Sequence, residues 1–119
     1  MVSDRHRPAY SLEKVKSLSA SGKLMVNGRS LRWIRNHLGR FDGMGIVRRV
    51  IDSIEQDDYD KSVSLRVERG TWADVYRFVL TGDEELDGED GWYVKLYIGD
   101  DGEMVHLNVL SANWEGYIH

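Results

Sequence analysis

The 119-residue chain contains no cysteine, only one proline and no long apolar run. Without cysteine there is no disulfide, no thiolate metal site and no cysteine nucleophile. No apolar stretch approaches the ~20 residues that cross a bilayer, so we expect no membrane partner. The first ten residues are polar and lack the apolar core of a signal peptide, which predicts a cytoplasmic protein. A hydrophobic fraction of 41% is enough to fill the core of a single domain over residues 1–119.

Acidic residues are scarce in the first half of the chain, and basic residues are scarce in the second half. Residues 1–50 hold 11 Lys and Arg against 3 Asp and Glu, whereas residues 51–119 hold 5 against 17. Six of these acids lie between residues 83 and 90, and without them the net charge changes from −4 to +2. The negative total therefore does not exclude nucleic acid as a partner.

The apolar pattern has helical spacing in the first half and alternates in the second. Helices are expected over residues 12–20, 31–38 and 44–54, with Ser11, Ser30 and Asp42 as N-caps, and a short strand over residues 23–26. Strands are expected over residues 59–67, 72–80, 92–98 and 103–110. Helices followed by an antiparallel meander predict an α+β domain, with the helices packed on one face of the sheet.

Metal and cofactor chemistry has little support in the pattern. The four histidines are scattered without ligand spacing. The acids of the turn over residues 99–103 favour a solvated hairpin over a calcium loop. Gly43-x-Gly45 favours the start of a helix over an anion site, because the Lys-Ser/Thr of a phosphate-binding loop is absent. We therefore expect neither a metal nor a cofactor.

The strand over residues 92–98 combines aromatic and cationic side chains. Alternation places Trp92 and its alternate neighbours in the core, and leaves an exposed row of Tyr93, Lys95 and Tyr97. Stacking platforms beside cations hold single-stranded nucleic acid, although cross-strand aromatic packing accounts for the same pattern. Lys61 shares a face with apolar neighbours, so its ammonium either reaches the solvated sheet edge or is partly desolvated.

Four short motifs occur in one order with compatible gaps: Phe41-Asp42-Gly43-Met44, Asp58-Tyr59-Asp60-Lys61-Ser62, Trp72-x-Asp74-Val75-Tyr76-Arg77 and Tyr93-x-Lys95. In these residues the chain resembles the motility quorum-sensing regulator (MqsR) toxin family. The resemblance covers about residues 8–110 and leaves residues 111–119 as a C-terminal tail. It implies a RelE-like α+β fold, with helices packed against an antiparallel sheet.

The resemblance also implies a function. Members of the family are toxins of bacterial type II toxin–antitoxin pairs that cleave mRNA without a metal ion. The implied partners are an mRNA substrate and a cognate antitoxin that silences the toxin. Two family positions carry over directly, onto Lys61 and Tyr93. The family's glutamine falls on Ala73, and its C-terminal lysine has no clear counterpart in this chain.

Cleavage of this kind needs a base at the ribose 2′-OH, positive charge at the phosphate and an acid at the leaving oxygen. Lys61 and Arg77 suit charge stabilisation, and Arg77 can replace the polar group missing at Ala73. Tyr93 serves as acid or base if neighbouring cations lower its pKa, and His106 is the alternative acid. RNA contacts are expected from Lys95, Tyr97 and Arg66.

Two other functions stay open. A catalytically weak RNA- or protein-binding module on the same fold is suggested by Ala73 and by the acidic second half. An unrelated small α+β interaction protein is disfavoured by the four ordered motifs. For an RNA-binding protein, trimming residues 83–90 is expected to strengthen binding at low salt.

Overall fold

The computed structural model describes residues 7–38, 42–65, 71–79 and 91–111. The acidic stretch 83–90, Arg66 and the tail beyond residue 111 lie outside these ranges. The described elements are, in chain order, α1 (Leu12–Ala20), β1 (Leu24–Val26), α2 (Gly28–Leu38), α3 (Gly43–Ser53), the 3₁₀ turn η1 (Gln56–Asp58), β2 (Tyr59–Ser64), β3 (Trp72–Phe78), β4 (Trp92–Ile98) and β5 (Val105–Ser111). The predicted α+β class is confirmed, and the fold is that expected of a RelE-like toxin.

The sheet has the strand order β1-β5-β4-β3-β2. The last four strands form the antiparallel meander that the sequence predicts. The short strand β1 differs, because it pairs parallel with β5 through Leu24↔Val105 and Val26↔Leu107. Strand β1 lies at the sheet edge next to β5, and along the chain it stands between α1 and α2. A tight hairpin turn, which would make it antiparallel to its neighbour, therefore does not connect it to another strand.

Side chains at the helix starts determine where the three helices begin. Ser11 and Asp42 cap α1 and α3 as expected, and Asp42 Oδ1 accepts a hydrogen bond of 3.0 Å from the Gly45 backbone N–H. The expected cap at Ser30 is wrong. Asn27 Oδ1 accepts from the Ser30 backbone N–H at 2.8 Å, so α2 begins at Gly28. Asparagine is a strong N-cap and comes first along the chain.

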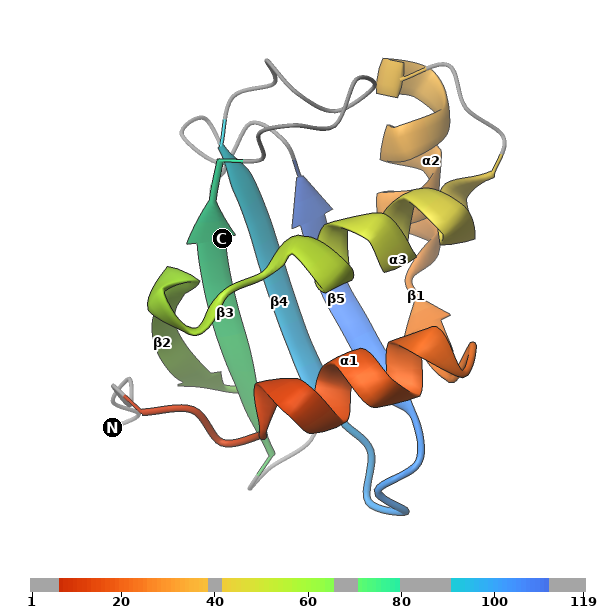
Figure 1. Ribbon diagram of the computed structural model, residues 1–119. Coiled ribbons are helices and arrows are strands. Elements are labelled where there is room, and N and C mark those ends of the chain that lie inside the picture. Colours follow the sequence, from red (N-terminus) through yellow and green to blue (C-terminus); the bar gives the residue numbers. More distant parts are fainter. Residues whose placement is uncertain (1–6, 39–41, 66–70, 80–90, 112–119) are drawn as a thin grey trace.

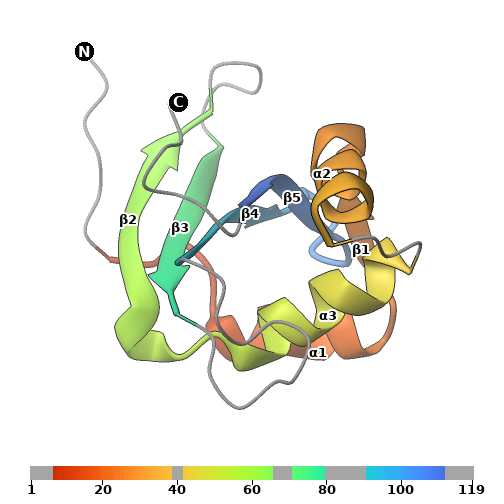
Figure 2. The same ribbon diagram turned by 90° about the horizontal axis from the view of Figure 1, so that it is seen from above.

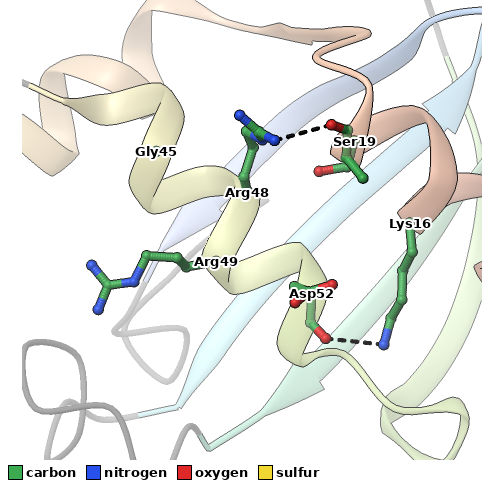
Figure 3. A pocket seen from close by; sticks show the side chains of 7 residues that line it. Lys16, Ser19, Gly45, Arg48, Arg49 and Asp52 are labelled. Atoms are coloured by element: carbon green, nitrogen blue, oxygen red, sulfur yellow. Dashed lines mark hydrogen bonds between the residues drawn. The ribbon is translucent and has the colours of Figure 1, made fainter.

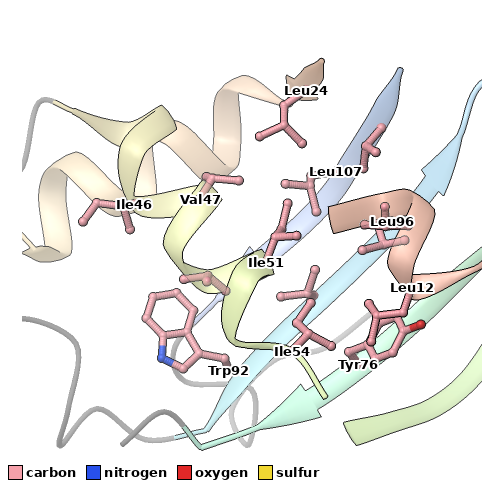
Figure 4. Close-up of a cluster of buried hydrophobic side chains, with 14 of the residues drawn as sticks. Leu12, Leu24, Ile46, Val47, Ile51, Ile54, Tyr76, Trp92, Leu96 and Leu107 are labelled. Atoms are coloured by element: carbon pink, nitrogen blue, oxygen red, sulfur yellow. The ribbon is translucent and has the colours of Figure 1, made fainter. Parts of the chain in front are cut away.

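Helices α1 and α3 cross one face of the sheet, and α2 stands beside β5 and β1 (Figures 1 and 2). The core lies between these layers and combines aliphatic side chains of α1 and α3 with the inner residues of β3, β4 and β5 (Figure 4). Trp92 is fully buried and meets the edge of Trp33 from α2, with ring centroids 6.0 Å apart. Burial of this apolar surface fixes which face of the sheet remains for function.

A buried carboxylate attaches the N-terminal segment to the sheet. Asp74 is fully buried on the helix side of β3 and accepts hydrogen bonds from the backbone N–H groups of Ala9 and Tyr10, at 2.9 and 3.0 Å. The Ser62 hydroxyl lies 2.5 Å from the same carboxylate. The Tyr10 hydroxyl donates to the Trp72 carbonyl at 2.6 Å. Asp74 of the third motif therefore holds the fold together rather than taking part in chemistry.

Candidate active site

The face of the sheet opposite α1 and α3, here called the far face, carries the site residues that the sequence predicts. Strand register arranges them in three rows. The first row contains Arg77 and its partner Tyr93, the second contains Val75 between Lys61 and Lys95, and the third contains Tyr97 and its partner His106. Neighbouring rows are about 7 Å apart along the strands. Residues remote in sequence thus meet on one surface.

A β-bulge in β2 decides which residues reach this face. Tyr59 pairs with Tyr76, Lys61 pairs with Val75, and the register shifts between them. Tyr59 consequently lies on the helix side, where its ring meets the Tyr76 ring at 5.8 Å and 69°. Strict alternation over the expected strand 59–67 would put Tyr59 and Lys61 on one face, and the extra residue Asp60 breaks this alternation.

Lys61 and Lys95 lie two strands apart in the same row, roughly 10 Å between backbones by the usual strand spacing. Burial, and next the charge of Lys61, lower the pKa of Lys95 below its ordinary value of 10.5. The second row is therefore a place where positive charge is concentrated. It is suited to holding a phosphate and to proton transfer by an amine.

The first row is built around Arg77. Its guanidinium carbon lies 5.5 Å from the centroid of the Tyr93 ring, and its Nε lies 3.3 Å from Asp60 Oδ2. Tyr93 is only 2% exposed, so the expected open row of phenols is wrong at this position. The bulge brings Asp60 to Arg77, and the alternating pattern of the sequence gave no sign of this ion pair.

Tyr97 and His106 form the third row, at the end of the sheet near the β4–β5 turn. Their rings are stacked, with centroids 4.7 Å apart and an interplanar angle of 8°. Both side chains are half-buried. His106, on β5, pairs with Tyr97 at the opposite end of β4 from Tyr93, about 13 Å away along the strand direction. The two acids that the sequence offers as alternatives are thus on opposite sides of the lysine row.

Ala73 also lies on the far face, fully buried, where the family resemblance places a glutamine. Arg77 shares this face, as expected, but it is four residues away, about 13 Å along the strand. Its guanidinium contacts Asp60 and the Tyr93 ring at the other end. Arg77 therefore does not stand in for a polar group at Ala73.

A hollow lies between α1 and α3, on the other side of the molecule (Figure 3). It has a volume of about 350 Å³ and includes Lys16, Arg48 and Arg49 in its lining. Two of these cations bind backbone carbonyls: Arg48 donates to Ala20 and Lys16 to Asp52, both at 3.0 Å. None of the predicted site residues lines it. The far face is therefore the better candidate site.

Two further observations concern the described ranges only. Within them, no three His, Asp or Glu side chains gather as ligands for a metal ion. None of the helices in the described part of the chain is long and apolar enough to cross a membrane.

The family model described as "Motility quorum-sensing regulator, toxin of MqsA" matches residues 7–109. This span contains all four ordered motifs and every predicted site residue. No curated protein matches the chain.

Proposed function

Because the chain belongs to the motility quorum-sensing regulator toxin family, we propose that this toxin is a metal-independent endoribonuclease that cleaves mRNA on the far face of its sheet. The cellular consequence is arrest of translation and growth. The proposal places the protein in the cytoplasm, where its substrate is. A cognate antitoxin, the partner named in the family's description, neutralises it.

The observation that carries the proposal is the convergence of three cations beside a tyrosine. Lys61, Lys95 and Arg77 come from three neighbouring strands onto one face, and Tyr93 lies beneath the Arg77 guanidinium. The lowered pKa of Lys95, caused by burial and by Lys61, marks this group as chemically adjusted. A perturbed titratable group beside other charged side chains is typical of catalytic sites.

Cleavage proceeds by attack of the ribose 2′ oxygen on the adjacent phosphorus, with loss of the 5′ oxygen of the next nucleotide. The 2′-OH loses its proton to a base, and the leaving oxygen receives a proton from an acid. The products are a 2′,3′-cyclic phosphate and a 5′-hydroxyl end. Lys61 and Arg77 stabilise the extra negative charge that develops on the phosphorane oxygens.

Proton transfer is assigned to the neighbouring groups. Lys95 acts as the base through the fraction of its amine that is neutral, which burial and next Lys61 increase by lowering its pKa. Tyr93 is the acid, because it lies next to Arg77 and one row away from Lys95. His106 remains the alternative acid, one row away on the other side.

The test combines growth with RNA chemistry. Induced expression of the wild-type chain in a bacterium should arrest growth, and mapping of transcript ends should show new 5′-hydroxyl ends. Lys61→Met and Tyr93→Phe should each reduce the cleavage rate of purified protein by about 10²-fold or more. Lys14→Met is the matched control, because Lys14 is exposed on α1 at the helix side. Equal rates for Lys61→Met and wild type would show that the assignment is wrong.

The second candidate is a catalytically weak RNA- or protein-binding module, favoured by the buried Ala73 where the family has a polar residue. It predicts no growth arrest and intact RNA after incubation with purified protein. Ala73→Gln restores the amide and separates the two functions. If the wild type does not cleave RNA and the Ala73→Gln variant does, the wild type has lost its activity through this position.

A further inference from the structure

We infer that the third row of the far face is a nucleobase-binding subsite, in which Tyr97, His106 and Met25 receive the base next to the scissile phosphate. This inference rests on the proposed function and specifies how the substrate is held. It assigns His106 to base binding rather than to proton transfer.

Register places the three side chains next to one another. His106 pairs with Tyr97 of β4 on one side and with Met25 of β1 on the other. Paired residues of neighbouring strands point to the same face. The row therefore runs across β4, β5 and the edge strand β1, as a continuous strip of two flat rings and one flexible thioether.

This strip can be reached from solvent. Met25 is 55% exposed, and Tyr97 and His106 are half-buried. Tyr93 and Val75, in the other two rows, are almost fully buried. Met25 thus extends the stacked aromatic pair into an apolar strip that a planar ligand can reach from solvent.

The rings are held in place by the backbone around them. A Cβ at Gly99 would come within 3.1 Å of His106 Nε2, so glycine leaves the room that the imidazole uses. The Tyr97 ring also supports the imidazole of His106 by stacking on it, with the two ring centroids 4.7 Å apart. A ring that is fixed before binding loses little entropy when a base stacks on it.

Charge separates the subsite from the phosphate site. The adjoining turn carries the exposed acids Asp100 and Asp101, which repel a phosphate, whereas the positive charge lies one row away at Lys95 and Lys61. The strip is consequently suited to the uncharged, planar part of a nucleotide. With a phosphate on the lysines, the base of an adjacent nucleotide is about one row, 7 Å, away.

The experiment uses the full chain and a non-cleavable 2′-O-methyl oligoribonucleotide of about ten nucleotides. Fluorescence anisotropy measures its affinity for wild type and for Tyr97→Leu, with intact RNA and with a single abasic site moved along the strand. For wild type, one abasic position should weaken binding roughly tenfold, the usual size of a base–aromatic contact. Tyr97→Leu should bind intact RNA about tenfold more weakly and be insensitive to that position. Tyr97→Phe should restore the sensitivity.

Equal loss in wild type and Tyr97→Leu at every abasic position would overturn the inference. If Lys61→Met weakens binding while Tyr97→Leu and His106→Leu bind like wild type, the subsite is wrong and the proposed function stands. If none of these changes alters binding, the far face does not bind RNA, and both fail.

A second measurement needs no variant and so does not depend on how substitutions affect folding. The same oligonucleotide carrying 5-iodouridine at one position at a time is irradiated with the wild-type protein, and the crosslinked residue is identified by mass spectrometry. A crosslink to Tyr97, His106 or Met25 from one position supports the subsite. Crosslinks that fall only on other residues contradict it.

Discussion

Lys61 and Lys95 flank Val75 on the far face of the sheet, one from β2 and one from β4. Two like charges in one row, next to a fully buried valine, raise the free energy of the folded protein. The result on Lys95 is a lowered pKa, for which burial is the larger cause and Lys61 the smaller. A cost of this kind is common where function, and not stability, selects the residues.

Lys95→Met should therefore stabilise the protein at neutral pH. The unfolded chain keeps the ordinary lysine pKa of 10.5, and the folded state has a lower one, so between these values the unfolded state binds more protons. The cost of the buried ammonium is fully present below the folded pKa and fades as pH rises toward 10.5. Urea unfolding at about pH 7 and about pH 10 should show the gain over wild type shrinking at the higher pH. Lys14→Met, at an exposed site, should show no such trend.

Asp60→Asn should strengthen RNA binding. Asp60 lies 3.3 Å from Arg77 Nε and neutralises part of the charge that the far face offers to a phosphate. The pair is about one-third exposed at each side chain, so its loss should change stability by less than about 1 kcal/mol. Salt titration of 2′-O-methyl RNA binding should give a slope of log K against log salt steeper by about 0.7, the value for one added phosphate contact. Asp52→Asn makes the same charge change at an exposed position of α3. An equal effect there would show that only the net charge of the protein matters.

The sequence predicts the elements of this fold well where the apolar period is strong. Residues 92–98 form β4 as expected, and Asp42 caps α3 as expected, because strand alternation and capping are local properties. The parallel pairing of β1 depends on where a three-residue strand joins the sheet, and the bulge at Asp60 depends on register. Neither is encoded in a short window of sequence.

The candidate site follows the same division. Lys61, Arg77 and Tyr93 could be named from the motifs. Strand alternation also assigned Arg77 and Tyr93 to definite faces of their strands. The contacts among them could not be named, since the Asp60–Arg77 ion pair and the burial of Tyr93 arise from packing between strands. Asp74 shows the opposite case: it belongs to a motif that suggests function, yet its partners are the backbone of Ala9 and Tyr10.

Asp74→Asn should destabilise the fold by about 2–3 kcal/mol, because a charged acceptor of two backbone N–H groups is replaced by an amide whose NH₂ meets donors. Equilibrium urea unfolding measures the change. Asp57→Asn, on the exposed 3₁₀ turn, should stay within about 0.5 kcal/mol of wild type. A loss of stability no larger than that of the control would show that the N-terminal segment is not attached through this carboxylate.

Gly45, the second glycine of the Gly43-x-Gly45 pattern at the start of α3, should be required only while Asp42 is present. A Cβ at Gly45 would collide with the Asp42 carboxylate, whose Oδ1 accepts the Gly45 N–H at 3.0 Å. Asp42→Ala removes the cap and should cost about 1 kcal/mol. Gly45→Ala should displace the same carboxylate at a similar cost, which the better helix propensity of alanine partly offsets. With the carboxylate gone the collision disappears, and alanine is the better helix former by about 0.8 kcal/mol.

The double variant Asp42→Ala/Gly45→Ala should therefore be no less stable than Asp42→Ala alone, and the two single costs should not add. Thermal or urea unfolding of wild type, the two single variants and the double variant completes this double-mutant cycle. Gly28→Ala serves as a comparison within α2, because a Cβ there meets only the far end of the Arg32 side chain, at 3.7 Å. Additive losses at residues 42 and 45 would mean that Gly45 is needed for a reason other than the cap.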